Sequence, residues 1–214
     1  MDDRAFDGTS LKIEYQPDVG LIIGKDVLLL YVDSSCHGNG TPDAKASVGM
    51  YAGPGHPMSK GYLLSPSQGR LTNQTAELHA LMSGVRSGMA ILLNSDTDIS
   101  PDPALKVLVI ASDSAYACGG ITRWIEKWRP SGFENVQNAY LFKQLDDLVI
   151  QAATVHGISI RFWQISREMN EKADGLARCV LEDEEQRREE LHWQWRPWLQ
   201  SVWYGDIVSF LLFG

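Results

Sequence analysis

Residues 28–39, with the sequence LLLYVDSSCHGN, constrain the fold more than any other stretch of the chain. Their apolar and β-branched side chains predict a buried strand that ends at Asp33 and then breaks into a turn of small residues. A carboxylate on a buried strand is costly unless it is paired or holds a metal ion. We therefore expect partners for Asp33 elsewhere in the chain, and the candidates are Glu77, Asp113 and Asp174.

The spacing of the apolar residues predicts an α/β protein with a mixed sheet and helices on its faces. Short strands at 46–52 and 61–64 follow the first strand closely, which indicates an antiparallel meander. From Thr72 onward the period becomes helical for about five turns. The remaining expected elements are a loop at 94–104, a strand at 105–111, helices at 121–128 and 138–156, a strand at 159–165 and a last helix from about residue 169 through the charged run 182–190.

We divide the chain into three parts. Residues 1–26 are expected to form an extended lead-in with at most a short strand around 21–23, and residues 27–190 form the catalytic domain. Residues 191–214 form a tail that holds four of the seven tryptophans. Packing of this tail onto the domain is the favoured interpretation, and a surface for a protein partner is the alternative, because exposed aromatic clusters often mark interfaces.

The net charge of −8 is unevenly distributed, so it does not exclude a nucleic-acid partner. Most of the excess acidic charge lies in residues 1–26 and 182–190. The three cysteines follow neither a metal-ligand nor a disulfide spacing. The first residues resemble neither a signal peptide nor a transit peptide, and no apolar run is long enough for a membrane helix. We expect a protein of the cytosol or nucleus without a membrane partner.

The four acidic residues are placed where a metal site would form. Asp33 and Asp113 come at the ends of strands, Glu77 lies early in a helix, and Asp174 lies at the start of the last helix. Ligands in open α/β sheets bind at the carboxyl ends of strands. Carboxylates that converge there would repel one another without cations, and oxygen ligands favour Mg²⁺ first and Mn²⁺ second. Each acid alone would more often be an ordinary turn or helix carboxylate.

Four segments of the chain resemble those around the acidic residues of ribonuclease H of type 1: YVDSSCHGNGT, TNQTAELHAL, ASDSAYACGGITRWIEKW and NEKADGLA. Their order and spacing also agree over about residues 27–181. The resemblance implies a ribonuclease H-like fold, with a five-stranded mixed sheet in the order 3-2-1-4-5 flanked by helices. It also implies an endonuclease that hydrolyses the RNA strand of RNA/DNA hybrids.

In the family, two Mg²⁺ ions about 4 Å apart carry the reaction. By resemblance, Asp33 would bridge both ions, Asp113 would bind the ion on the nucleophile side, and Glu77 and Asp174 would lie on the other side. Asn39, Asn73 and Gln74 would then contact 2′-hydroxyls and the minor groove of the hybrid. The remaining substrate contacts that the resemblance implies are Thr72 and Asn138 near phosphates and Trp124, with its neighbour Trp128, along the DNA strand.

The chain also departs from the family pattern. The loop before Asp174, ISREMNEKAD, is short and lacks the usual histidine, for which Arg167 or Glu168 are the candidate substitutes. Serine at 34 and alanine at 115 replace the usual glycine and glutamine. Packing explains the spacing of Trp124 and Trp128 as well as DNA contact does.

We expect a monomeric, working but slower enzyme. The alternatives are a catalytically weak hybrid-binding module and a transposon-derived ribonuclease H-like nuclease with another substrate preference.

Overall fold

The computed structural model describes residues 4–7, 12–16, 19–65, 67, 69–93 and 106–187. The predicted loop at 94–104, the end of the charged run and the tryptophan-rich tail at 191–214 lie outside the described residues. The predicted boundaries after residues 26 and 190 stay predictions. Within the described part, no helix combines the length and the apolar character that a membrane crossing requires.

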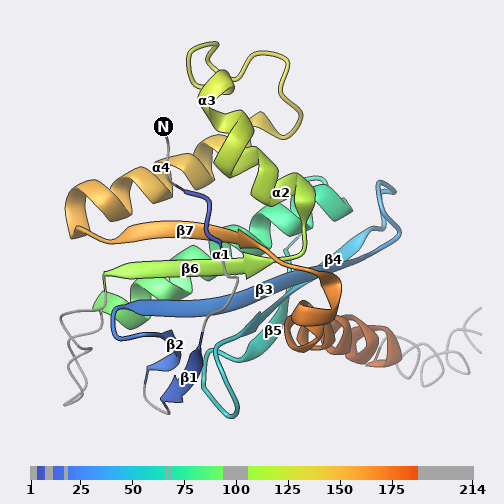
Figure 1. The fold of residues 1–214 in the computed structure, drawn as a ribbon. Coiled ribbons are helices and arrows are strands. Elements are labelled where there is room, and N and C mark those ends of the chain that lie inside the picture. Colours follow the sequence, from blue (N-terminus) through green and yellow to red (C-terminus); the bar gives the residue numbers. More distant parts are fainter. Residues whose placement is uncertain are drawn as a thin grey trace, which may run out of the picture.

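The described strands form one mixed sheet (Figure 1). Its central strand, β3, pairs antiparallel with β4 along one edge and parallel with β6 along the other, while β5 and β7 lie outside these neighbours. The predicted order 3-2-1-4-5 is confirmed by this arrangement, β5-β4-β3-β6-β7. The strand bounds are β1 Ile13–Gln16, β2 Gly20–Ile23, β3 Val27–His37, β4 Lys45–Tyr51, β5 Lys60–Leu63, β6 Val107–Ser112 and β7 Ser159–Gln164.

Two details of the strands differ from the sequence prediction. The sheet has seven strands, because β1 and β2 form a hairpin whose second strand pairs with the start of β3. Strand β3 also continues past Asp33, because Ser34 to His37 keep pairing with β4 as far as Lys45. The turn begins only at Gly38, whose φ of 66° lies in the left-handed region that glycine adopts most easily.

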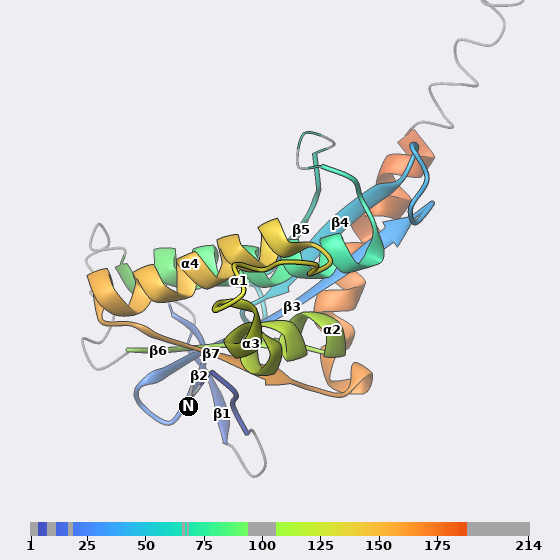
Figure 2. The same ribbon diagram turned by 90° about the horizontal axis from the view of Figure 1, so that it is seen from above.

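The helices are α1 Asn73–Leu93, α2 Ala115–Gly119, α3 Ile125–Trp128 and α4 Ala139–His156, and residues 171–187 form a further helix. A π-helical turn, Gly120–Trp124, joins α2 to α3, and a 3₁₀ turn, Arg167–Asn170, precedes the last helix. The helix predicted at 121–128 therefore begins earlier, at Ala115. Helices α1 and α4 run side by side along the sheet (Figure 2).

The sheet is covered on both faces, and β3 contributes to both cores because successive side chains of a strand point to opposite sides. Leu28, Leu30 and Val32 belong to the large core beneath α1 and α4. Leu29 and Tyr31 belong to a smaller core on the other face, which also contains Ala173 of the last helix. Asp33 continues the second set, so its side chain points to the face on which the last helix lies.

Two glycines let the last helix approach this face closely. A Cβ atom on Gly49 of β4 would stand 2.1 Å from the carbonyl oxygen of Ala173, and one on Gly61 of β5 would stand 2.3 Å from that of Leu176. The hydroxyl of Ser47 donates to the Ala177 carbonyl at 2.6 Å. The helix backbone therefore rests directly on β4 and β5.

The N-terminal segment lies along the outer edge of β7. The Phe162 amide donates to the Arg4 carbonyl at 2.7 Å, and the Phe6 amide donates back to the Phe162 carbonyl at 3.0 Å. Arg4 is buried, and its guanidinium donates at 2.7 Å to the buried Asp146 of α4. Arg129 forms a second ion pair with the same carboxylate through two hydrogen bonds of 2.9 and 2.7 Å.

Candidate active site

Asp33 and Asp113 are brought together by the register of two parallel strands. Tyr31 of β3 pairs with Ala111 of β6, and each aspartate lies two residues further along its strand direction. On the other edge of β3, Asp33 pairs with Gly49. The two carboxylates therefore leave the sheet at the same level, at the carboxyl end of the parallel pair.

Glu77 reaches the same place from α1. Thr72 and Thr75 stabilise the start of this helix, because each side-chain oxygen accepts from the other residue's amide, at 3.1 and 2.8 Å. Glu77 follows in the second turn. The hydroxyl of Ser114, which also caps α2, donates to Glu77 Oε2 at 2.6 Å. One serine thus orients both the glutamate and the helix after Asp113.

Asp174 comes from the first turn of the last helix. The guanidinium of Arg178 lies one turn further along and makes an ion pair with Asp174 at 3.3 Å. Ala173, the residue before Asp174, packs closely against Gly49. Gly49 is also the residue of β4 that pairs with Asp33, so the first turn of the last helix lies next to Asp33.

All four predicted carboxylates line one cavity of about 350 Å³. Asn73, Tyr116, Arg167 and Arg178 also contribute to its wall. In the described part of the chain, no three His, Cys, Asp or Glu side chains already form a coordination shell. The carboxylates therefore surround a shared space, and their role as metal ligands stays a prediction.

The cavity is electrostatically unfavourable for its carboxylates. Burial, together with repulsion from Asp113 and Asp174, raises the pKa of Asp33 to about 7, although the Ser34 amide and Arg167 act in the opposite direction. Burial is also the main cause that raises the pKa of Glu77, and the charge of Asp113 adds to it, against the hydrogen bond from Ser114. A cation in the cavity would remove this cost.

Asn170 orients one of the carboxylates that line the cavity. Its side chain is fully buried, and its amide nitrogen donates to Asp113 Oδ1 at 2.8 Å and to the Val32 carbonyl at 3.0 Å. The amide group thus connects the end of the 3₁₀ turn with β3 and with the aspartate after β6.

Of the predicted substrate residues, only Asn73 lines the cavity. Its backbone amide donates to Asn39 Oδ1 at 3.0 Å. The amide group of Asn138 donates at 3.0 Å to the hydroxyl of Tyr116, a residue of the cavity wall. Gln74 accepts from Gln137 at 2.8 Å. Thr72 serves as the helix cap described above, and contact of these residues with substrate stays a prediction.

The two tryptophans after α2 have different environments. Trp128 packs against Phe142 of α4, with ring centroids 4.8 Å apart, and belongs to the edge of the large core. Trp124 is 38% exposed and has its ring 6.4 Å from that of Tyr116. Packing therefore accounts for Trp128, whereas Trp124 is partly exposed and lies beside Tyr116, a residue of the cavity wall.

Sequence reasoning did not find Ser114, Tyr116 and Asn170. All three are uncharged and lie within the segments that carry the family resemblance. Their position beside the acidic residues was the only available signal, because their hydrogen bonds depend on residues distant in the sequence.

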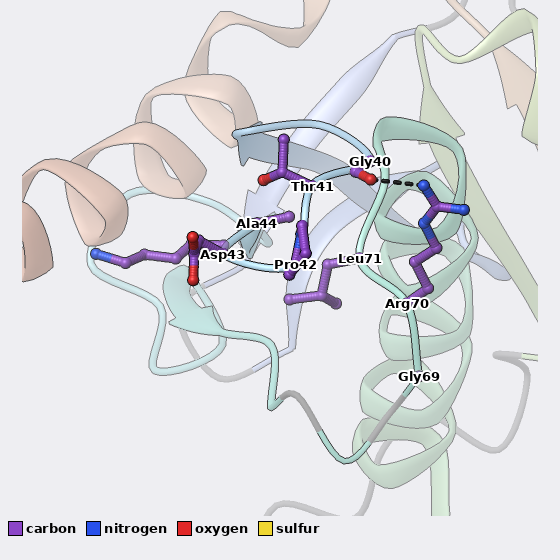
Figure 3. A pocket seen from close by; sticks show the side chains of 9 residues that line it. Gly40, Thr41, Pro42, Asp43, Ala44, Gly69, Arg70 and Leu71 are labelled. Atoms are coloured by element: carbon purple, nitrogen blue, oxygen red, sulfur yellow. Dashed lines mark hydrogen bonds between the residues drawn. The ribbon is translucent and has the colours of Figure 1, made fainter.

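A second, larger cavity of about 610 Å³ lies next to the start of α1 (Figure 3). Its wall is formed by residues 40–45 of the β3–β4 connection and by residues 69–71. Arg70 donates to the Gly40 carbonyl at 2.5 Å and so ties the two segments together (Figure 3). None of the four carboxylates lines this cavity, so we assign the chemistry to the smaller one.

The comparison with known proteins agrees with the fold. The family model described as RNase H matches residues 25–182. Ribonuclease H1 of Mus musculus is 32% identical over 160 residues, covering 71% of this chain and 49% of the mouse protein. Ribonuclease H of Cereibacter sphaeroides is 31% identical over 161 residues, covering 72% of this chain and 94% of that protein.

Among solved structures, RNase H1 of Halobacterium salinarum has 20% identity and a TM-score of 0.44, with coverage of 73% of this chain and 98% of that one. The chain spans about half the length of the mammalian relatives that it matches. The match of the family model over most of the chain defines a protein with the ribonuclease H-like fold. The chain belongs to the RNase H family, and its curated relatives agree with the type 1 resemblance.

Proposed function

We propose that this protein is an endonuclease that hydrolyses the RNA strand of RNA/DNA hybrids with the help of divalent metal ions. The observation that carries the proposal is the gathering of Asp33, Glu77, Asp113 and Asp174 around one cavity at the carboxyl end of the parallel strands. Membership of the RNase H family supports the class of reaction.

The cavity suits a hard divalent cation. Its four acidic residues offer only oxygen ligands, which is the donor set that Mg²⁺ and Mn²⁺ prefer. Burial raises the pKa of Asp33 and of Glu77, and the negative charge of Asp113 adds to it in both cases. When bound, the metal would activate a water and stabilise the charge of the phosphate. These four residues would hold it.

The remaining residues of the cavity prepare the carboxylates. Asn170 fixes one oxygen of Asp113, and Ser114 fixes one oxygen of Glu77. The Ser34 amide donates to Asp33 Oδ1 at 2.7 Å. These donors orient the carboxylates before substrate arrives.

Asn39, Asn73 and Gln74 are positioned to recognise the hybrid. The hydrogen bond from the Asn73 backbone amide to Asn39 Oδ1 joins the β3–β4 connection to the start of α1. Hybrids are recognised mainly by shape and by 2′-hydroxyls, for which amide side chains are suitable partners. Contacts of this kind would select the RNA strand without reading its sequence.

The test is cleavage of an end-labelled RNA/DNA hybrid with Mg²⁺, with Mn²⁺ and with a chelator. We expect metal-dependent cleavage of the RNA strand, and an Asp113→Asn variant that is reduced to background. Single-stranded RNA and duplex RNA of the same sequence are offered in parallel. Equal activity of the variant and the parent protein would refute the proposal.

Two alternative functions give different results in the same assay. A hybrid-binding module would retard the hybrid in a gel without cutting it. A nuclease with another preference would cut single-stranded or duplex RNA at least as well as the hybrid.

A further inference from the structure

The wall of the candidate active site contains two guanidinium groups in different situations. Arg178 forms an ion pair with Asp174, with 3.3 Å between Arg178 Nε and Asp174 Oδ2. Arg167 also lines the cavity, but it makes no hydrogen bond or ion pair with any residue that the structure describes. Its side chain is exposed, so this positive charge is available to a molecule that enters the cavity.

The backbone around Arg167 is held in place although it lies between two elements. Just before it, the Ile165 amide donates to the Ser112 carbonyl of β6 at 3.0 Å. Just after it, the Met169 amide donates to the Ser166 carbonyl at 3.1 Å, and the buried Asn170 is bonded to Val32. The short turn is therefore anchored on both sides, which fixes the point from which the arginine side chain extends.

Arg167 and Glu168, the two candidate substitutes for the missing histidine, can now be separated. Glu168 does not line the cavity. Hydrogen bonds from its own backbone amide and from the Ser166 side chain lower the pKa of its carboxyl. Arg167 faces the cavity, and its charge acts on Asp33, the most strongly perturbed carboxylate there.

We propose that Arg167 is a catalytic residue that binds the non-bridging oxygens of the scissile phosphate and stabilises the negative charge that builds up during cleavage. The inference rests on the proposed function and adds a residue to it. A guanidinium fits a phosphate in a bidentate manner and is attracted by its charge. In the hydrolysis, a bond forms between the water oxygen and phosphorus, and the bond between phosphorus and O3′ breaks.

The proton balance excludes Arg167 from acid or base chemistry. One of the two water protons is released to solvent as the water attacks, and the other stays on the new 5′-phosphate or ionises from it. The departing O3′ takes up a proton from solvent. Arginine keeps its proton throughout, because a guanidinium is not deprotonated in proteins. Its contribution is therefore a fixed positive charge.

The first experiment measures single-turnover cleavage of the hybrid with Mg²⁺ by Arg167→Ala, Arg167→Lys and Lys172→Ala. Lys172 is a matched control, because it is an exposed cation five residues away that does not line the cavity. We expect Arg167→Ala to lose about 100-fold in rate, with a much smaller change in KM. Arg167→Lys should recover a large part of the loss, and Lys172→Ala should match the parent protein.

The second experiment follows the rate of Arg167→His, divided by that of the parent protein, from pH 5 to 9. If positive charge is what matters, this ratio falls as pH rises through the histidine pKa of about 6.5, because the imidazole becomes neutral. A ratio that rises through that pH indicates proton transfer and overturns the proposal.

Failure of the inference and failure of the proposed function are distinguishable. If the parent protein shows no metal-dependent cleavage of the hybrid, the proposed function has failed. If the parent protein cleaves and Asp113→Asn does not, but Arg167→Ala is as fast as the parent, only the role of Arg167 is refuted. An equal loss in Arg167→Ala and Lys172→Ala would also refute it, since general attraction of the nucleic acid would then explain both.

Discussion

Asn170 shows how an uncharged residue can control a charged site. One amide nitrogen serves both Asp113 Oδ1 and the Val32 carbonyl, and the side chain has no exposed surface. Rotation of this side chain would break both hydrogen bonds, and a buried polar group that loses its partner costs about 1–3 kcal/mol. The carboxylate of Asp113 therefore has little freedom to turn away from the cavity.

We predict that Asn170→Ala weakens metal binding. The substitution removes the donor that orients Asp113, and changes of this kind typically cost about 10- to 100-fold in metal affinity or activity. The Mg²⁺ concentration that gives half of the maximal cleavage rate should rise accordingly, as measured in a titration at saturating hybrid. A lower rate with an unchanged Mg²⁺ requirement would contradict this prediction and indicate a purely structural role.

A second prediction concerns Asp33 in the absence of metal. Its pKa of about 7 lies above the value of about 3.9 in an unfolded chain. The folded protein then binds more protons than the unfolded chain between about pH 4 and 7, so the free energy of unfolding falls as pH rises through this window.

In chelator at pH 8, Asp33→Asn should therefore be more stable than the parent protein by on the order of 2 kcal/mol, with the difference vanishing toward pH 4. Urea unfolding at several pH values measures it. Added Mg²⁺ should stabilise the parent protein but not the variant. A parent protein that is the more stable of the two in chelator at pH 8 would refute this account.

At this scale, the sequence was most informative about charged residues. Asp33 and Asp113 could be placed because each follows an apolar strand, and Glu77 because a helical period surrounds it. Asn170 lies in a polar segment that offers no sign of burial. Its contacts come from β3, 138 positions away, and from Asp113. Tertiary packing of that kind has no local pattern.

Among the elements, the last helix is positioned by the absence of side chains beneath it. Gly49 allows the Ala173 carbonyl to approach β4, and Asp174 is the next residue along the helix. Any side chain at position 49 would have to displace this backbone, since the contacting atoms are a carbonyl oxygen and an amide nitrogen of the helix.

We predict that Gly49→Ala lowers both stability and activity. The added methyl group forces the helix outward, at a typical cost of about 1–3 kcal/mol, and moves Asp174 with it. Thermal unfolding and hybrid cleavage measure the two effects.

Gly175→Ala on the same helix is the control for Gly49→Ala. Nothing lies within 4 Å of its Cβ position, so it should leave stability unchanged or raise it by up to about 1 kcal/mol. Similar losses of stability and activity in Gly49→Ala and Gly175→Ala would show that the close contact between the last helix and β4 is not the cause of the loss in Gly49→Ala.

Strand β1, which sequence analysis missed, is only four residues long. All four residues are exposed, so the brief alternation of its sequence IEYQ does not correspond to a buried face. Its structure depends on pairing with β2, which in turn pairs with β3. The early start of α2 was also missed, although Ser114 caps this helix locally by accepting from the Ala117 amide at 3.1 Å.

Over the whole molecule, Asp146 connects three distant parts of the chain. Its buried carboxylate holds Arg4 of the N-terminal segment and Arg129, which follows α3, while Asp146 itself lies on α4. Burial alone would raise the pKa of Asp146, but the hydrogen bonds and charges of Arg129 and Arg4 outweigh it and lower the pKa.

We predict that Asp146→Asn is destabilised by about 3–5 kcal/mol at pH 7, because two arginines lose their shared counter-charge. Asp147→Asn is the matched control, since its ion pair with Lys143 is exposed, and it should cost less than about 1 kcal/mol.

The lowered pKa means that the contribution of Asp146 is fully present above about pH 4 and is lost as pH falls through its folded value. The gap between parent and Asp146→Asn in urea unfolding should therefore close in acid, and a gap that is constant with pH would contradict this.

The N-terminal segment covers the edge of β7 and so limits self-association of the protein. An uncovered strand at the margin of a sheet offers free amides and carbonyls, which recruit strands from other molecules. Arg4 and Phe6 occupy those groups at Phe162, and the ring of Phe6 covers Trp163 at a centroid distance of 5.9 Å. Trimming the first few residues would therefore bare both hydrogen-bonding groups and an indole surface, and would favour self-association of an otherwise intact fold.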